Sequence, residues 1–164
     1  MNLSIESIAH KHFDGLRAAL DSVARERRFL AFTEAPLPAQ SRAFYESVIA
    51  DASILLVAVL DGAVVGWCDV LQTHGQACAH VGCLGMGVIA SARGRGTGTR
   101  LLKTAIDAAW AAGLTRIELI VRADNSVAKA LYERHGFVVE GRQRQAFRVD
   151  GVHFDGISMA LLHP

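Results

Sequence analysis

The stretch MGVIASARGRGTGTRLL, residues 86–102, places three glycines within five positions between an apolar run and a helix-like pattern. Gly94, Gly96 and Gly98 alternate with other residues there. Glycine at this density lets the backbone turn sharply and approach a ligand closely. Where such a loop enters the N-terminus of a helix, its N–H groups and the helix dipole favour an anion. The stretch therefore predicts a strand–loop–helix unit that binds phosphate; the alternative is an exposed turn with solvated arginines.

The spacing of the glycines excludes two common phosphate loops. A Walker loop needs Gly-Lys followed by Ser or Thr, which is absent here, and a dinucleotide fingerprint needs glycine where Thr99 stands. The pattern that fits is R-x-x-G-x-G, from Arg93 to Gly98. Arg93 and Arg95 add positive charge that suits phosphate oxygens. The ligand is therefore expected to be a phosphate that is neither a P-loop nucleotide nor a Rossmann dinucleotide.

The composition indicates one globular domain over residues 1–164. The chain is 51% hydrophobic and 20% charged, and a chain of this length can bury a single sizeable core. A net charge of +1 does not predict nucleic acid as a partner. Neither a membrane-spanning run nor a signal-peptide pattern is present, so we expect a cytoplasmic protein that does not act at a membrane.

Cysteine and histidine gather in one region, which raises a metal site as an alternative. His74, Cys78, His80 and Cys83 stand close in sequence, but without a CxxC or HxxxH pair. Strand residues that follow one another point to opposite faces, which separates such ligands. We therefore expect the three cysteines, which include Cys68, to be reduced buried thiols, and we expect no metal.

The remaining pattern predicts a mixed sheet with helices on it. Strands are expected at 3–9, 53–60, 63–71, 79–89, 115–121, 137–149 and 153–162, with helices at 13–30, around 41–48, 98–113 and 125–136. Two Asp-Gly pairs predict hairpins, hence antiparallel neighbours. The helix between the fourth and fifth strands implies a parallel pair with a right-handed crossover.

At this point the sequence resembles the GCN5-related N-acetyltransferase superfamily, in which a [QR]-x-x-G-x-[GA] loop holds the pyrophosphate of acetyl-coenzyme A. A second signature of that family is matched by NSVAKALYERHGF, residues 125–137. The two signatures span roughly residues 84–140, about a third of the chain. One departure is Ala90, where many members carry proline. The resemblance implies an α/β fold with a mostly antiparallel sheet of about seven strands and about four helices, splayed between the fourth and fifth strands.

The resemblance also implies acetyl-coenzyme A as the acyl donor and assigns residues to it. Pantetheine would bond to exposed strand backbone, the pyrophosphate to the glycine loop, and an asparagine would contact the donor. The implied residues are Met86, Gly87, Val88, Arg93, Gly94, Arg95, Gly96, Thr97, Gly98 and Asn125.

Tyr132 is the catalytic residue that the resemblance implies. It would act as general acid and donate its phenolic proton to the coenzyme A thiolate. A phenol with an ordinary pKa of about 10 is protonated at neutral pH. Tyr132 stands seven positions after Asn125, so the two share a helix face. The alternative is a core tyrosine whose hydroxyl is bonded at the surface.

The acceptor is expected to be a primary amine of a small molecule that attacks the thioester directly. The alternatives are a protein N-terminus or lysine as acceptor, or a sensor that binds acetyl-coenzyme A without turnover. Glu34 and Arg28 are substrate candidates, because the segment between the first two helices borders the acceptor site in the resembled family. The candidates for the general base are Glu34, Asp69, His74 and His80, or water.

Two further expectations concern the last strands. Arg142, Arg144 and Arg148 alternate along one predicted strand, so they are expected on one face, solvated or facing an acidic acceptor. The terminal hairpin offers an edge through which a homodimer could form.

Overall fold

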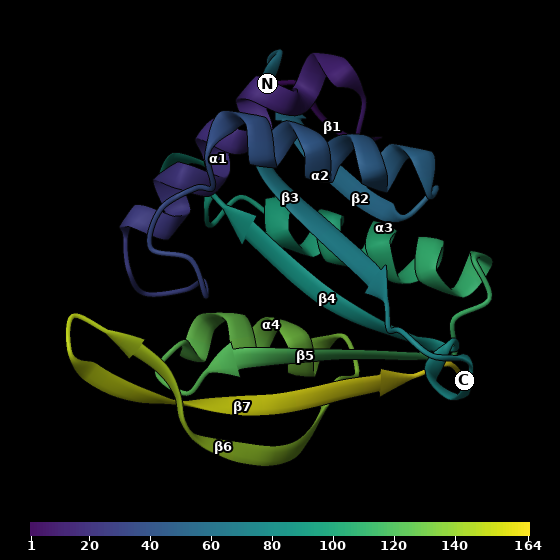
Figure 1. Cartoon of the computed structure of the whole chain (residues 1–164), viewed down its shortest axis with the longest axis vertical. Coiled ribbons are helices and arrows are strands. Elements are labelled where there is room, and N and C mark those ends of the chain that lie inside the picture. The colour runs from purple at the N-terminus through teal and green to yellow at the C-terminus, as the bar shows by residue number, and fades with distance from the viewer.

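A seven-stranded sheet runs through the computed structural model, which describes residues 1–164 (Figure 1). Its order is β1-β2-β3-β4-β5-β7-β6, and every neighbouring pair is antiparallel except β4 and β5. The predicted mixed sheet is therefore confirmed. The strands are β1 (Leu3–Ser7), β2 (Ile54–Leu60), β3 (Ala63–Gln72), β4 (Val81–Val88), β5 (Arg116–Arg122), β6 (Val138–Val149) and β7 (Val152–Leu162).

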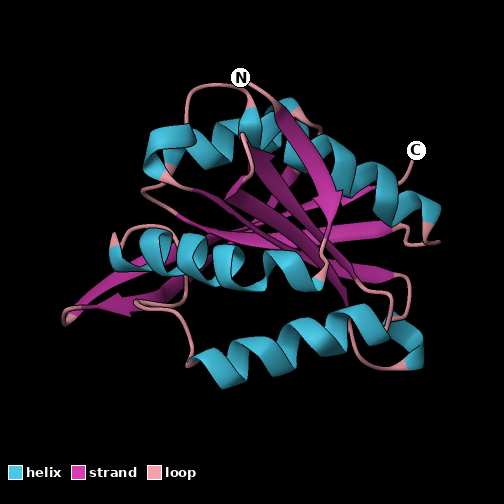
Figure 2. Ribbon diagram, turned by 90° about the horizontal axis from the view of Figure 1, so that it is seen from above, coloured by secondary structure: helices cyan, strands magenta, loops and turns pink.

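Helices cover both faces of the sheet (Figure 2). They are α1 (Phe13–Arg25), α2 (Pro38–Ala50), α3 (Thr97–Ala111) and α4 (Ser126–Arg134). Alternation along β3 separates two apolar clusters: Trp67 packs with α1 and α2, whereas Cys68 packs with α3 and α4. No helix combines the length and the apolar character needed to cross a membrane.

The sheet opens between β4 and β5, as predicted. The two strands pair only where Val81, Gly82 and Cys83 meet the first residues of β5. Beyond that point they diverge, and Figure 1 shows them meeting near the C-terminus and opening away from it. Residues 84–88 of β4 therefore present a backbone edge that lacks a strand partner on the β5 side.

The first helix is shorter than the predicted 13–30. It ends at Arg25, and Arg27 has a φ of 58°, a left-handed conformation that ends a helix. The carbonyl of Arg27 accepts a hydrogen bond from Arg122 Nη1 at 3.0 Å. A contact 95 residues away along the chain thus helps turn the last predicted helical residues into a loop, residues 26–31, called here the acceptor loop.

A bulge in β6 removes Arg144 from the face that three arginines were predicted to share. Residues 144–146 lie opposite the single residue Asp155, and Gln145 has a φ of 53°. Asp155 holds the bulge by accepting hydrogen bonds from Arg142 Nε at 2.7 Å and from the Gln145 amide at 2.9 Å. Arg142 and Arg148 lie opposite Ile157 and His153, which share a face of β7, so only Arg144 leaves the predicted row.

Candidate functional site

A cavity of about 860 Å³ lies at the opening between β4 and β5. Its donor wall consists of β4 residues 83–88, the glycine loop and the start of α3. Opposite lie α4, the acceptor loop and the bulged part of β6. The predicted donor residues Met86, Gly87 and Val88 all line it. The opening of the sheet thus creates a cavity that joins both signature segments.

The glycine loop presents backbone donors to this cavity. Gly94 and Gly96 have φ values of 70° and 79°, which glycine adopts without strain. The N–H groups of residues 94–99 donate to no acceptor within the chain, whereas Thr97 is fixed because its hydroxyl donates to the Ala92 carbonyl at 3.2 Å. Free amides at the start of a 15-residue helix are suited to an anion.

The two loop arginines are placed differently. The Arg93 guanidinium binds both carboxylate oxygens of Glu26 and stacks on Phe29, with 4.8 Å from Cζ to the ring centroid. Its Nε donates to the Val88 carbonyl at 2.8 Å. Arg93 therefore connects the donor wall to the acceptor loop. Arg95 is exposed, lies 3.4 Å from Met1 Sδ and does not line the cavity.

Asn125 caps the start of α4, Tyr132 lies in its last turn, and both residues line the cavity. Asn125 is the N-cap of the helix, and its Oδ1 accepts a hydrogen bond from the Ala128 amide at 3.2 Å. Its side-chain amide nitrogen is left for a ligand. Tyr132 is 7% exposed and packs with Phe137 at 5.6 Å between ring centroids.

The environment of Tyr132 keeps its hydroxyl protonated. Burial raises the pKa of Tyr132 well above its ordinary value, and the nearby Cys68 and Asp69 add to the rise. The hydroxyl makes no hydrogen bond within the chain. Tyr132 therefore belongs to the core, as its alternative interpretation predicted, and also faces the cavity with a proton to donate.

Of the two predicted substrate residues, one reaches the cavity. Arg28 lines it from the acceptor loop, together with Phe29 and Leu30. Glu34 does not: it is exposed and pairs with Arg25 Nη2 at 3.4 Å. His74 and His80 precede β4 at the end where β4 and β5 are still paired, and neither lines the cavity.

Asp69 lies on β3, next to Gly85 of β4, and does not itself line the cavity. It pairs in register with Gly85, and a Cβ on Gly85 would lie 3.4 Å from each of its carboxylate oxygens. Burial raises the pKa of Asp69 to about 7. No hydrogen bond or ion pair within the chain holds this carboxylate.

Arg122 lies beside the site and was not among the residues predicted from the sequence. It is 3% exposed at the end of β5, binds Asp124 through Nε (2.9 Å) and Nη2 (2.6 Å), and stacks on Phe154 at 3.7 Å. Its third bond, to the Arg27 carbonyl, fixes the acceptor loop. The sequence offers no signal for it beyond an arginine at a strand end.

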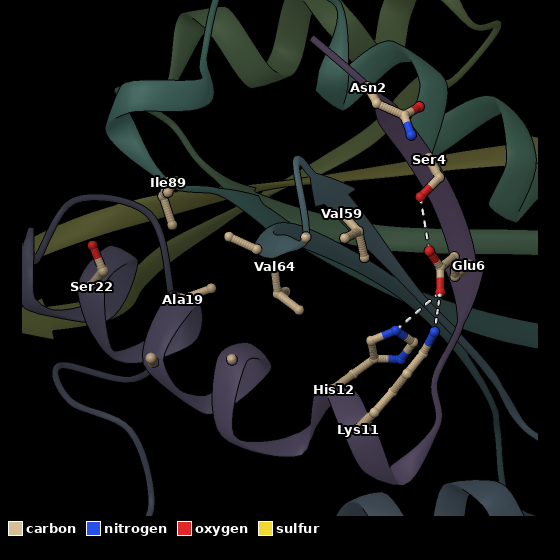
Figure 3. A pocket seen from close by; sticks show the side chains of 14 residues that line it. Asn2, Ser4, Glu6, Lys11, His12, Ala19, Ser22, Val59, Val64 and Ile89 are labelled. Carbon is tan, nitrogen blue, oxygen red and sulfur yellow. Dashed lines mark hydrogen bonds and ion pairs between the residues drawn. The ribbon is translucent and has the colours of Figure 1, made fainter.

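A second cavity, of about 760 Å³, lies between β1, α1 and the β2–β3 turn (Figure 3). Its carboxylate, Glu6, is fully committed: it accepts a hydrogen bond from Ser4 Oγ at 2.8 Å and contacts His12 Nε2 and Lys11 Nζ at 3.1 Å each. The buried His12 also accepts a hydrogen bond from the Ala9 amide through Nδ1. These contacts connect β1 to the start of α1, and they leave Glu6 without a free oxygen for a ligand.

The predicted ligand types for a metal do not converge. No group of three or more His, Cys, Asp or Glu side chains is placed to hold a metal ion. Cys83 lines the acetyl-donor wall of the main cavity rather than joining His74, Cys78 and His80. All three cysteines are free thiols, but only Cys68 is buried. The prediction of buried thiols is wrong for Cys78 and Cys83, which are exposed.

The chain is similar in sequence to known acetyltransferases. Residues 18–137 match the sequence model of the acetyltransferase (GNAT) family. L-amino acid N-acetyltransferase AaaT from Escherichia coli is 32% identical over 107 residues, 64% of this chain and 65% of that protein. The chain spans less than two thirds of the length of AaaT and of two mycothiol acetyltransferases that it also resembles.

Solved structures extend the similarity over nearly the whole chain. A GNAT-family acetyltransferase from Streptococcus pneumoniae is 29% identical, with a TM-score of 0.91 over 98% of this chain and 99% of that one. YncA from Salmonella typhimurium, solved with its cofactor acetyl-CoA, has a TM-score of 0.93 over 100% and 95% of the two chains at 18% identity. The predicted fold, including the splayed sheet, is confirmed.

Proposed function

Because the chain belongs to the acetyltransferase (GNAT) family, we propose that it transfers the acetyl group of acetyl-coenzyme A to a primary amine of a small molecule, with Tyr132 as general acid. Family membership supports the predicted enzyme class and the predicted acyl donor. The choice of acceptor and the role of Tyr132 are our proposal. The observation that carries it is one cavity that joins free loop amides to a buried, protonated phenol.

The residues of the donor wall fit an acyl-coenzyme A. The free amides of residues 94–99 match the negative pyrophosphate, and the unpaired edge of β4 matches the amide groups of pantetheine. The small Gly85 and Gly87 leave that edge accessible. When bound, acetyl-coenzyme A supplies an activated acetyl thioester. We propose that the loop amides and Asn125 hold it, and that Arg93 acts mainly by fixing the loop through Glu26.

Tyr132 would supply the proton that the departing thiolate needs. A carbon–sulfur bond breaks more readily when the leaving sulfur is protonated, and a positioned acid typically contributes 10²–10⁴-fold. The raised pKa of Tyr132 keeps its Oη–H intact throughout the neutral range. Burial also excludes water, which would compete with the amine as nucleophile.

The acceptor wall supports a small amine that carries a negative group. Phe29, Ile120 and Phe147 give it apolar surface, and Arg28 is a cation at its edge. Arg28 is exposed, so it can pair with a carboxylate as the amine enters. This chemistry fits an amino acid, and an L-amino acid N-acetyltransferase is among the curated relatives. A protein N-terminus or lysine, and a sensor without turnover, are the alternatives that the test must separate.

The test is a turnover screen with acetyl-coenzyme A, in which free thiol is measured against a panel of amino acids, polyamines, aminoglycosides and lysine peptides. We expect turnover with amino acids, a higher KM in Arg28→Ala, and no turnover with peptides. Turnover with peptides alone would assign a protein acetyltransferase. Binding of coenzyme A without turnover of any amine would assign the sensor. A cytoplasmic location and a homodimer through β6 stay predictions, for which fractionation and light scattering are the measurements.

A further inference from the structure

We propose that Asp69 is the general base of this site, the group that removes the proton from the acceptor ammonium across Gly85, directly or through one water. The proposal rests on the proposed acetyl transfer and deepens it, because it assigns the proton acceptor. A base must lie within reach of the proton that it takes, so position comes before acidity.

The position of Asp69 follows from the strand register. Trp67 and Asp69 lie on the same face of β3, and their neighbours on β4 are Gly87 and Gly85. A Cβ on Gly87 would clash with the Trp67 ring, and one on Gly85 would contact both Asp69 oxygens at 3.4 Å. Both side chains therefore extend over the glycines of β4. Gly85 lines the cavity, whereas the Asp69 carboxylate does not line it and lies against Gly85 on the face of the sheet that carries Trp67.

The face that carries Asp69 is the acceptor side of the cavity. Trp67 packs in the same apolar cluster as Val23 of α1, and Val23 lines the cavity with the acceptor loop. Tyr132 lies in the other cluster, on the α4 side of the sheet. The proposed base and the proposed acid thus approach the opening between β4 and β5 from opposite faces of the sheet.

The other carboxylates around the cavity are neutralised by cations. Asp124 is held by Arg122, which lowers its pKa, and Glu26 is held by Arg93. Glu118, beside Cys83, pairs with Arg116 at 3.0 Å. A carboxylate held by arginine is a poor proton acceptor, since the cation stabilises its charged form. Asp69 is the carboxylate beside the cavity that no cation holds.

The electrostatics of Asp69 suit a base at neutral pH. The titratable groups near it are Cys68 on β3, Cys83 on β4 and Tyr132 on α4, and all three have raised pKa values. They are neutral near pH 7, so burial alone sets the pKa of Asp69 at about 7. Two acidic groups with widely separated pKa values in one site can divide the acid and base roles.

Asp69 and Tyr132 would move the protons of the reaction in turn. The Asp69 carboxylate takes one proton from the ammonium, and the neutral amine forms a C–N bond with the thioester carbon while the C–S bond breaks. Tyr132 gives its proton to the leaving sulfur and regains one from the nitrogen as the amide forms. Asp69 then releases its proton to solvent, so one proton leaves per acetyl group transferred.

The decisive experiment compares Asp69→Asn, Gly85→Ala and wild type, with Asp107→Asn, an exposed carboxylate on α3, as the matched control. We expect Asp69→Asn to lower kcat by about 10²–10⁴-fold and to abolish the decline of kcat/KM below pH 7, with an unchanged Kd for coenzyme A. Gly85→Ala keeps the carboxylate but inserts a methyl group at ordinary contact distance, so we expect an intermediate loss of kcat. Asp107→Asn should match wild type.

A readout that is independent of turnover is the carboxyl ¹³C NMR titration of Asp69 in protein free of acetyl-coenzyme A. A midpoint near 7 supports the proposal, and a midpoint near 4 overturns it. It is also overturned if wild type acetylates an amine while Asp69→Asn keeps kcat within threefold and the same pH profile. If wild type binds coenzyme A but acetylates no amine, the proposed function fails, and the base assignment fails with it.

Discussion

The two walls of the cavity are built by different means. The donor wall consists mostly of backbone: the open edge of β4 and the free amides of residues 94–99. The opposite, acceptor wall includes the acceptor loop, whose position depends on arginine side chains from distant segments. Arg93 bonds to Glu26, and Arg122 bonds to the Arg27 carbonyl. A backbone site needs glycines at fixed spacing, whereas a loop held by side chains can be built from many sequences. The donor wall can therefore be predicted from the sequence, and the acceptor wall cannot.

The largest effect should come from removing the proposed acid. In Tyr132→Phe we expect kcat to fall by about 10²–10⁴-fold, because the thiolate then leaves without a positioned proton. The ring still packs against Phe137, so the melting temperature and the Kd for coenzyme A should change little. Steady-state kinetics with calorimetric binding measures both. An unchanged kcat would return Tyr132 to a purely structural role in the core.

The next effect concerns the stability cost of Asp69. Its pKa is raised on folding, so the folded state binds more protons than the unfolded state between about pH 4 and 7. Stability should therefore fall as the pH rises through this range, and the cost is complete above pH 7. Asp69→Asn removes this dependence, and we expect it to stabilise the protein by roughly 2–4 kcal/mol at pH 8 relative to pH 4. Urea unfolding of both proteins at several pH values measures it, and parallel pH profiles would contradict it.

The parts of the fold that could be predicted from the sequence are those that depend on local signals. The hairpins at Asp61-Gly62 and Asp150-Gly151 and the crossover through α3 depend on local signals, and these parts of the fold are confirmed. The glycine loop was predicted from the spacing of its glycines between a strand and a helix, and two of these glycines have positive φ values. The end of α1 and the bulge in β6 depend instead on long-range bonds, from Arg122 to Arg27 and from Asp155 to Gln145. A periodicity read along the chain contains no information on such bonds.

Within the site, too, the candidate bases are distinguished by contacts between distant segments. Asp69 was one of four base candidates in the sequence, chosen for strand position alone. Only the pairing of β3 with β4 places it over a glycine at the cavity, and only the folded structure commits Glu34 to Arg25. Whether a carboxylate is free depends on which cation reaches it, and that is decided by tertiary structure.

A smaller effect should show which wall Arg93 serves. In Arg93→Met, we expect a stability loss of about 1 kcal/mol, since the Glu26 pair is partly exposed. We also expect the amine KM to rise about fivefold because the acceptor loop loosens, while the Kd for coenzyme A changes less than threefold. Glu26→Gln should reproduce this pattern, and the double variant should add little to it. A tenfold weaker coenzyme A affinity with an unchanged amine KM would instead make Arg93 a direct phosphate ligand.

The last prediction isolates the backbone of the donor wall. A Cβ on Gly96 would meet no atom within 4 Å, so Gly96→Ala tests only the φ of 79°. An alanine pays about 1–2 kcal/mol in this conformation, because its Cβ approaches the carbonyl oxygen. We expect a stability loss of that size if the loop holds its shape, or a several-fold weaker binding of coenzyme A if the loop relaxes to avoid the strain. Gly141→Ala, which also meets no atom within 4 Å but has no positive φ, is the matched control and should leave both quantities unchanged. If Gly96→Ala also leaves the stability and the coenzyme A affinity unchanged, the free amides need no left-handed residue at position 96. The glycine spacing is then not the reason why the donor wall can be predicted from the sequence.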